Sequence, residues 1–165
     1  MKHLIAFLLF STTMFVQAQV DYGTPQKNTP LPAVLQGLDR TIVVKHFPEV
    51  NHPIQIGDNY YWKHATALYA EESPVTILEF GAYLYYNDQW NLRQKYPLKD
   101  FDKFFGTKNE QLLQAQPYVW ADNWRVGDSL FGGWALWYFI GQTPDGKRVC
   151  GYQTIHTTSD LLTSK

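Results

Sequence analysis

Cysteine, methionine and an excess of positive charge are nearly absent from this sequence. Cys150 is the only cysteine in 165 residues, so no disulfide can form within the chain. Both methionines, Met1 and Met14, lie near the amino terminus, so the rest of the chain lacks the usual axial ligand of a blue-copper site. The 14 basic and 15 acidic residues do not provide the basic excess of nucleic-acid-binding proteins. We therefore expect no nucleic-acid partner, no metal and no cofactor.

The first residues have the three-part pattern of a secretory signal peptide. Lys2 precedes an apolar run from Leu4 to Val16, and Val16-Gln17-Ala18 is a typical cleavage site. The run has about thirteen residues, fewer than the roughly 20 that a membrane-spanning helix needs. We therefore expect residues 1–18 to be a signal peptide. The mature chain would then be secreted or periplasmic and contain no membrane span.

The residues that follow divide into two regions. Residues 19–38 contain three prolines and few apolar side chains, which predicts a flexible tether. Of the 24 aromatic residues after Ala18, 22 fall between Tyr60 and Tyr152, which places the core in this part of the chain. We therefore expect residues 39–165 to form a single β-rich domain.

The segment 75–86 is the clearest predicted strand. Its side chains alternate, so that Leu78 and Phe80 are expected on the same apolar face. Asn87-Asp88 is typical of a tight turn, because both residues tolerate left-handed backbone geometry. Residues 89–95 are therefore expected to return alongside 75–86 as a β-hairpin.

A short helix is expected near residues 98–105. Pro97 suits the first turn of this helix, and Gly106 suits its carboxyl-terminal cap. A second turn is expected at 143–147, where proline is followed by Asp-Gly. Further strands are expected at 41–47, 59–70, 118–120, 134–141 and 149–156. Together these elements predict a mainly β fold, an antiparallel β-sandwich or barrel of about six to seven strands.

One short string resembles a catalytic motif. Gly127-Asp128-Ser129-Leu130 resembles the nucleophile block of the GDSL esterases and lipases. That family implies an Asp-x-x-His pair near the carboxyl terminus, but Gln153 stands three residues before the one downstream histidine, His156. A serine without a base and an orienting acid is a weak nucleophile. We therefore expect Ser129 to be inert and predict no catalytic residue.

Two further pairs could carry chemistry. Cys150 and His156 have a spacing known from copper proteins, but a strand between them would separate the donors by about 20 Å. His64 and Glu79 lie on neighbouring predicted strands and could meet across a sheet. A hydrogen-bonded histidine in a polar patch is the preferred interpretation of His64, because a third metal ligand is not defined.

The aromatic residues carry the main functional hypothesis. Aromatic rings that are rimmed by amide and arginine side chains suit sugar rings, which stack on the aromatic face while polar groups bind the hydroxyls. The alternative is that the rings simply fill the core, and Trp90 is expected there because it shares a face with Leu92. The proposed ligand-binding residues are Tyr83, Tyr85, Trp90, Arg93 and Trp124.

These observations favour a binding protein over an enzyme. The leading hypothesis is an exported ligand- or glycan-binding module, with carbohydrate or another envelope protein as its partner. One alternative is a small cell-envelope hydrolase that uses acidic and histidine side chains such as Glu79 and His64. The other is a structural subunit of an envelope assembly, which would present a broad apolar patch.

Overall fold

The structure is a computed structural model that describes residues 20–162 and is mainly β, with 52% strand and 8% helix. The expected fold class is therefore confirmed: several antiparallel strands accompany one short helix. Seven strands have four residues or more, and seven have only two or three. Within residues 20–162 the sheets are open and form no closed barrel. The predicted signal peptide, residues 1–18, lies outside the described residues.

The longer elements follow the sequence-based expectation, except that the strand expected at 59–70 is divided in two; six further strands of two or three residues are not expected from the sequence. Two 3-10 turns, at Ala33–Leu35 and Leu98–Asp100, accompany the helix α1 (Phe101–Phe105). The strands are β1 (Val20–Asp21), β2 (Asp39–Arg40), β3 (Ile42–Phe47), β4 (Val50–Asn51), β5 (Ile54–Ile56), β6 (Asn59–Trp62), β7 (Ala65–Ala70), β8 (Val75–Tyr86), β9 (Gln89–Lys95), β10 (Gln111–Leu112), β11 (Tyr118–Trp120), β12 (Arg125–Gly127), β13 (Phe131–Gln142) and β14 (Arg148–Thr157).

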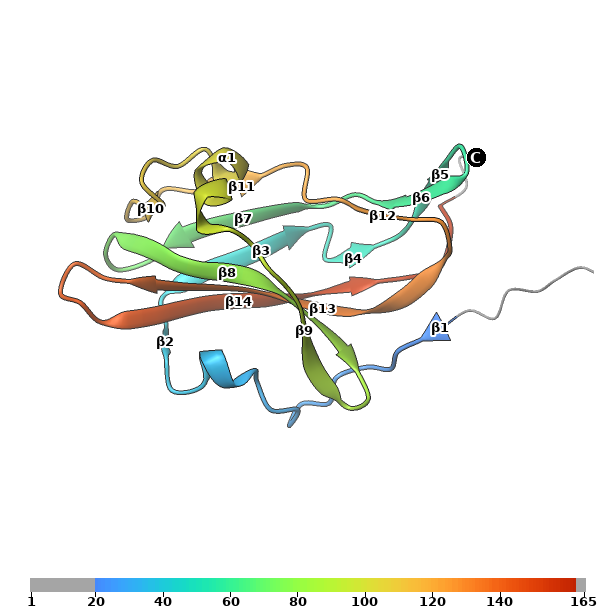
Figure 1. Cartoon of the computed structure of the whole chain (residues 1–165), viewed down its shortest axis with the longest axis horizontal. Coiled ribbons are helices and arrows are strands. Elements are labelled where there is room, and N and C mark those ends of the chain that lie inside the picture. The colour runs from blue at the N-terminus through green and yellow to red at the C-terminus, as the bar shows by residue number, and fades with distance from the viewer. Residues whose placement is uncertain (1–19, 163–165) are drawn as a thin grey trace, which may run out of the picture.

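The largest sheet has β13 at its centre, antiparallel to both β8 and β14 (Figure 1). Phe139 of β13 lies opposite Phe80 of β8 and Gly151 of β14. The strand is apolar on both faces because each face contacts a separate group of buried side chains. β9 pairs with β8 at one edge, whereas β2 and β4 pair with β14 at the other.

A second layer, formed by β3, β7 and β11, covers one face of this sheet (Figure 1). The first core cluster lies between the two layers, where Ile42 and Leu68 face Phe80 and Phe139. Helix α1 closes one end of the cluster, and its Phe101 is completely buried. A third small sheet, formed by β5, β6 and β12, continues beyond the second layer.

The regular alternation expected for β8 is broken near its start. Pairing between β8 and β13 shifts between Ile140 and Gly141, where Leu78 has no partner on β13. A bulge of this kind changes the face on which the following side chains lie. Ile77 and Phe80 consequently share the first core cluster, whereas Leu78 is 41% exposed. The expected placement of Leu78 on the buried face with Phe80 is therefore wrong.

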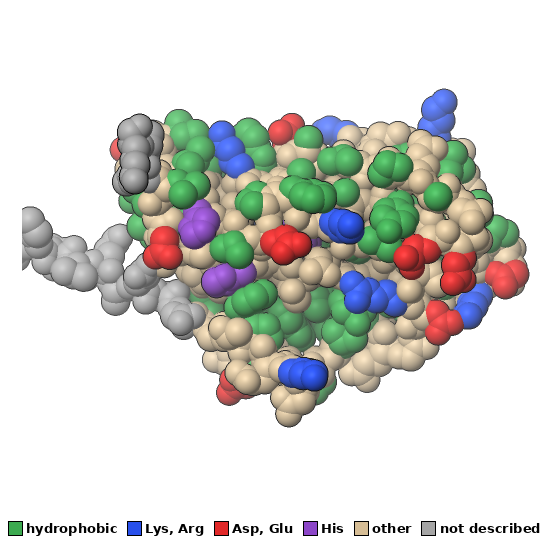
Figure 2. Space-filling view, turned by 180° about the vertical axis from the view of Figure 1, so that it is seen from behind, with side chains coloured by type: hydrophobic (Ala, Val, Ile, Leu, Met, Phe, Trp, Pro, Cys, Tyr) green, Lys and Arg blue, Asp and Glu red, His purple; other side chains and the backbone are tan. Residues whose placement is uncertain are grey.

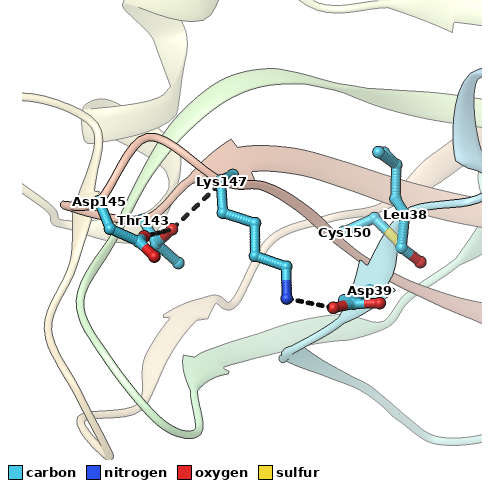
Figure 3. A network of polar contacts seen from close by, with 6 residues as sticks. All are labelled: Leu38, Asp39, Thr143, Asp145, Lys147 and Cys150. Atoms are coloured by element: carbon cyan, nitrogen blue, oxygen red, sulfur yellow. Dashed lines mark hydrogen bonds and ion pairs between the residues drawn. The ribbon is translucent and has the colours of Figure 1, made fainter.

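The two predicted turns are present. Asn87 and Asp88 have φ angles of 52° and 58°, which are the left-handed values of a two-residue hairpin turn. At the other turn, the Thr143 hydroxyl donates to the Asp145 carboxylate, and Lys147 forms an ion pair with Asp39 of β2 (Figure 3). Both partners of this ion pair are exposed, so the pair adds little to the stability of the protein, although it links the turn to β2.

The segment expected to be a tether lies against the sheet. β1 pairs in parallel with β13, and the chain then passes along the outer face of the sheet towards β2 (Figure 1). Leu35 is only 2% exposed and belongs to a second core cluster, on the opposite face of β13 from the first. The second cluster consists of Leu35, Tyr83, Leu136, Tyr138, Ile140 and Cys150, with Leu31, Leu38, Trp90 and Tyr152 packed against it.

Leu35 tests whether residues 19–38 are dispensable. Replacing Leu35 with alanine should reduce the free energy of unfolding by about 2 kcal/mol, because it opens a cavity under a segment that can partly relax. Val34→Ala is the matched control, because Val34 is exposed on the same turn. Chemical denaturation of both variants measures the difference. Equal stability of the two would support a mobile tether instead.

Candidate functional site

A cleft opens between the two layers at the end of the first core cluster. Its floor is formed by small or medium side chains, including Ala82, Leu84 and Ala135. Elsewhere in the core, large aromatic rings fill the corresponding space between the layers. Its other wall comes from β6, β12 and the segment before β12. The volume is about 140 Å³, and we call this space the inner cleft.

A second depression adjoins the inner cleft. It has a volume of about 270 Å³ and is lined by Tyr22, Tyr85, Phe131 and Trp134, among others; we call it the outer hollow. Both spaces are smaller than the roughly 300–1,000 Å³ of typical small-molecule sites. The two spaces share the lining residues Leu84, Arg125, Ala135 and Thr157. Arg125 is therefore accessible from both.

Two arginines face the inner cleft without an acidic partner. Arg125 is partly buried, with its guanidinium carbon 3.9 Å from the ring centre of Phe131. Burial and then the positive charge of Arg93 lower the pKa of Arg125 to about 10, so Arg125 stays charged at neutral pH. Among residues 20–162 the ion pairs are Lys95–Glu79 and Lys147–Asp39, and neither involves these arginines.

His64 lines the inner cleft, and one of its ring nitrogens is buried without a hydrogen-bond partner among the described residues. Its Nδ1 lies 3.3 Å from the Asn51 amide nitrogen, an arrangement in which Nδ1 accepts and Nε2 carries the proton. Burial lowers the pKa of His64 to about 4, with the Trp62 carbonyl acting in the opposite direction, so the ring is neutral at pH 7. Nε2 is buried and has no partner in hydrogen-bond geometry within the described chain. A buried donor without a partner costs about 1–3 kcal/mol, which a bound acceptor would recover.

A buried polar network holds the wall of the cleft. The Asn123 amide donates to the Thr66 hydroxyl at 2.9 Å, and this hydroxyl lies 3.0 Å from His46 Nδ1. His46 Nε2 in turn lies 3.3 Å from the Gln153 carbonyl on β14. The network ties both layers to the segment that carries Trp124. Trp124 can therefore stay 44% exposed at the cleft while its backbone is anchored.

The five residues predicted to bind ligand do not lie on one face. Arg93 and Trp124 line the inner cleft, and Tyr85 lines the outer hollow. Trp90 packs edge-on against Tyr85, with ring centres 5.3 Å apart, and contacts the second core cluster. Tyr83 is buried, with its ring 5.2 Å from that of Tyr138.

Leu92 does not accompany Trp90 into the core. Trp90 is half-buried, but Leu92 is 54% exposed. The register between β8 and β9 shifts between Ala82 and Tyr83, next to the Tyr83–Leu92 pair, so simple alternation does not describe this edge strand. The contact that buries Trp90 is with Tyr85, its direct partner across the hairpin.

Sequence reasoning missed several residues that line the inner cleft. His64 was interpreted as a satisfied histidine, and Arg125, Asn51 and Asn123 were not singled out. The sequence signal for Arg125 is its place between Trp124 and the apolar Val126. The sequence gives no signal for Asn51 and Asn123, because the residues that lie near them in the structure are distant in the chain.

The candidate catalytic groups remain apart. The Ser129 hydroxyl is exposed and hydrogen-bonds only to Asp128, at 3.3 Å. Glu79 bonds to Lys95 and Tyr138 at 2.5 and 2.9 Å, whereas His64 lies on the other side of β13, near Trp137. The structure therefore does not bring His64 and Glu79 together as an acid–base pair.

Comparisons with known proteins do not assign the chain to a family. No family model matches the chain, and no curated protein or solved structure is significantly similar to it. Among residues 20–162, no three histidine, cysteine or acidic side chains converge as metal ligands would. The helices within this range are all too short to cross a membrane. The inner cleft and the outer hollow are therefore the features of this structure that bear on function.

Proposed function

We propose that this protein is an exported binding module that holds a small, ring-shaped ligand in the inner cleft. The observation that supports this most is the combination of an exposed aromatic side chain with cationic groups that have no acidic partner among residues 20–162. Trp124 is 44% exposed at the cleft beside Arg93 and Arg125, and the buried amides of Asn51 and Asn123 line the same space. Aromatic faces with adjacent amides suit a sugar ring. The limited volume favours a ligand of monosaccharide size over a long chain.

The proposal includes export of the protein and a partner in the cell envelope. Export is supported by the pattern in residues 1–18, which directs the mature chain to the periplasm or the outside of the cell. A role as a structural subunit has less support, because hydrophobic side chains occur in several small groups on the face seen in Figure 2. A hydrolase has less support too, because His64 and Glu79 lie apart.

Trp124 provides the test of ligand binding. The mature protein is screened by thermal melting against a panel of neutral and acidic monosaccharides and aromatic acids. A ligand should raise the melting temperature of the native protein, as mass action requires. Trp124→Ala should abolish this rise and change the melting temperature of the free protein little, because the side chain is 44% exposed.

Phe47→Ala is the matched control. Phe47 is another exposed aromatic residue but does not line either space. Its removal should leave the ligand-dependent rise intact. A panel in which no compound stabilises the native protein, or in which both variants respond like it, would contradict the proposed function.

A further inference from the structure

We infer that the ligand bound in the inner cleft is a carboxylate carried on a ring, with its charge held by Arg125 and Arg93. The inference rests on the proposed function and narrows it from small ring-shaped ligands to acidic ones. An acidic sugar and an aromatic carboxylic acid share this chemistry, and both fit a wall that contains Trp124 and Trp137.

The charge distribution supports an anion. Acidic residues outnumber basic ones in the whole chain, yet among residues 20–162 no acidic side chain lines the inner cleft or the outer hollow. Arg93 and Arg125 both line the inner cleft. On the face seen in Figure 2, several acidic side chains gather near the end of the molecule that carries the β13–β14 turn in Figure 1. The cleft is therefore locally positive in a protein that is slightly negative.

The environment of Arg125 makes it a stronger anion site than a surface arginine. Its guanidinium lies against the face of Phe131, which itself stacks on Trp62 with ring centres 4.0 Å apart. This contact fixes the plane of the guanidinium while it removes part of its water. A carboxylate that pairs with an oriented and partly desolvated guanidinium forms two parallel charge-assisted hydrogen bonds.

His64 adds a third donor of a different kind. His64 lines the same cleft and is only 8% exposed, and its buried Nε2 has no hydrogen-bond partner among residues 20–162. Because the ring is neutral at pH 7, it offers a hydrogen bond without further charge. A ring hydroxyl or the second carboxylate oxygen would satisfy it.

A carboxylate fits these donors better than a phosphate. Phosphate groups are commonly bound at the amino-terminal end of a helix, where several backbone N–H groups converge. The described residues that line the inner cleft come from strands and their connections, and none of them belongs to a helix. Two arginine side chains and one imidazole N–H match the smaller charge of a carboxylate.

Isothermal titration of the mature protein tests the inference with matched pairs of probes. D-glucuronate is compared with D-glucose, benzoate with benzamide, and D-glucose 6-phosphate serves as the phosphate probe. At least one carboxylate should bind about tenfold or more tightly than its neutral partner. Its affinity should fall as salt is added. Preference for glucuronate or for benzoate tells which kind of acid the cleft accepts.

The variants separate the inference from the proposed function. Arg125→Gln should weaken carboxylate binding about tenfold or more and leave neutral ligands unaffected. Arg93→Gln, at an exposed position, should act in the same direction and serves if Arg125→Gln fails to fold. Arg148→Gln is the control, because Arg148 is exposed and lines neither space.

The binding results distinguish failure of the carboxylate inference from failure of the proposed function. Equal binding of the neutral and acidic partners, unchanged in the arginine variants, would overturn the inference and leave the proposed function standing. Binding of glucose 6-phosphate in place of both carboxylates would also overturn it. No binding of any probe, together with no response in the thermal screen, would count against both.

Discussion

Gly151→Ala should destabilise the protein by about 3 kcal/mol, through overpacking at a close contact between β14 and β3. A methyl group at position 151 would lie 2.3 Å from the Ile42 carbonyl oxygen and 2.6 Å from the Ile42 Cβ. Neither atom can move freely, because Ile42 belongs to β3 and is 1% exposed in the first core cluster. The added group would therefore push β3 away from β14.

Gly132→Ala is the matched control for this substitution. A Cβ at position 132 would meet its nearest neighbour, the Thr157 carbonyl oxygen, at 3.5 Å, which is an ordinary contact. Thermal melting should show a fall of roughly 6–12 °C for Gly151→Ala and little change for the control. Similar melting temperatures for the two variants would contradict the close packing of β3 on β14.

The second large effect is a loss of stability in mild acid. Burial, and then the charge of neighbouring His64, lower the pKa of His46 from 6.5 to about 4; burial likewise lowers that of His64 to about 4. The rings are 5.7 Å apart. Since both values are lowered on folding, the unfolded chain binds more protons below pH 6.5, and stability falls as the pH decreases from 6.5 towards 4. Above pH 6.5 this contribution is constant.

By pH 5 each histidine should cost about 2 kcal/mol, so that the pair costs about 4 kcal/mol relative to pH 7.5. Urea denaturation at the two pH values measures the loss. His64→Gln should reduce this loss of stability by about half, since one of the two buried histidines is removed. His52→Gln should leave the loss unchanged, because His52 is not one of the two. A free energy of unfolding that is unchanged between pH 7.5 and pH 5 would mean that these histidines are not buried in neutral form.

Local sequence signals predicted much of the fold. The hairpin at Asn87-Asp88 and the end of α1 at Gly106, with φ of 68°, depend on backbone preferences that a few adjacent residues determine. The apolar run in 134–141 predicted a central strand, because only a strand covered on both faces tolerates such a sequence. Where pairing is irregular, the same reasoning failed, as it did for Leu78 and Leu92.

The candidate site could be predicted only in part. Arg93 and Trp124 were identified, because a charged or aromatic residue beside amides is visible in the sequence. Their partners Arg125 and His64 become meaningful only at the cleft, where residues from β9, β12 and the segment before β7 meet. The spacing of these residues in the sequence does not predict that they lie together, because their proximity depends on how the layers pack.

The sequence by itself determined the mainly β class, the positions of the long strands and turns, and the balance of charge. These properties depend on periodicity and on backbone preference, which act over a few residues. The tertiary structure decided which aromatic rings fill the core, where residues 20–38 lie, and which cations lack acidic partners. Those properties depend on contacts between distant segments. Two arginines become a candidate anion site only because folding brings them to a cleft that no acidic side chain of residues 20–162 lines.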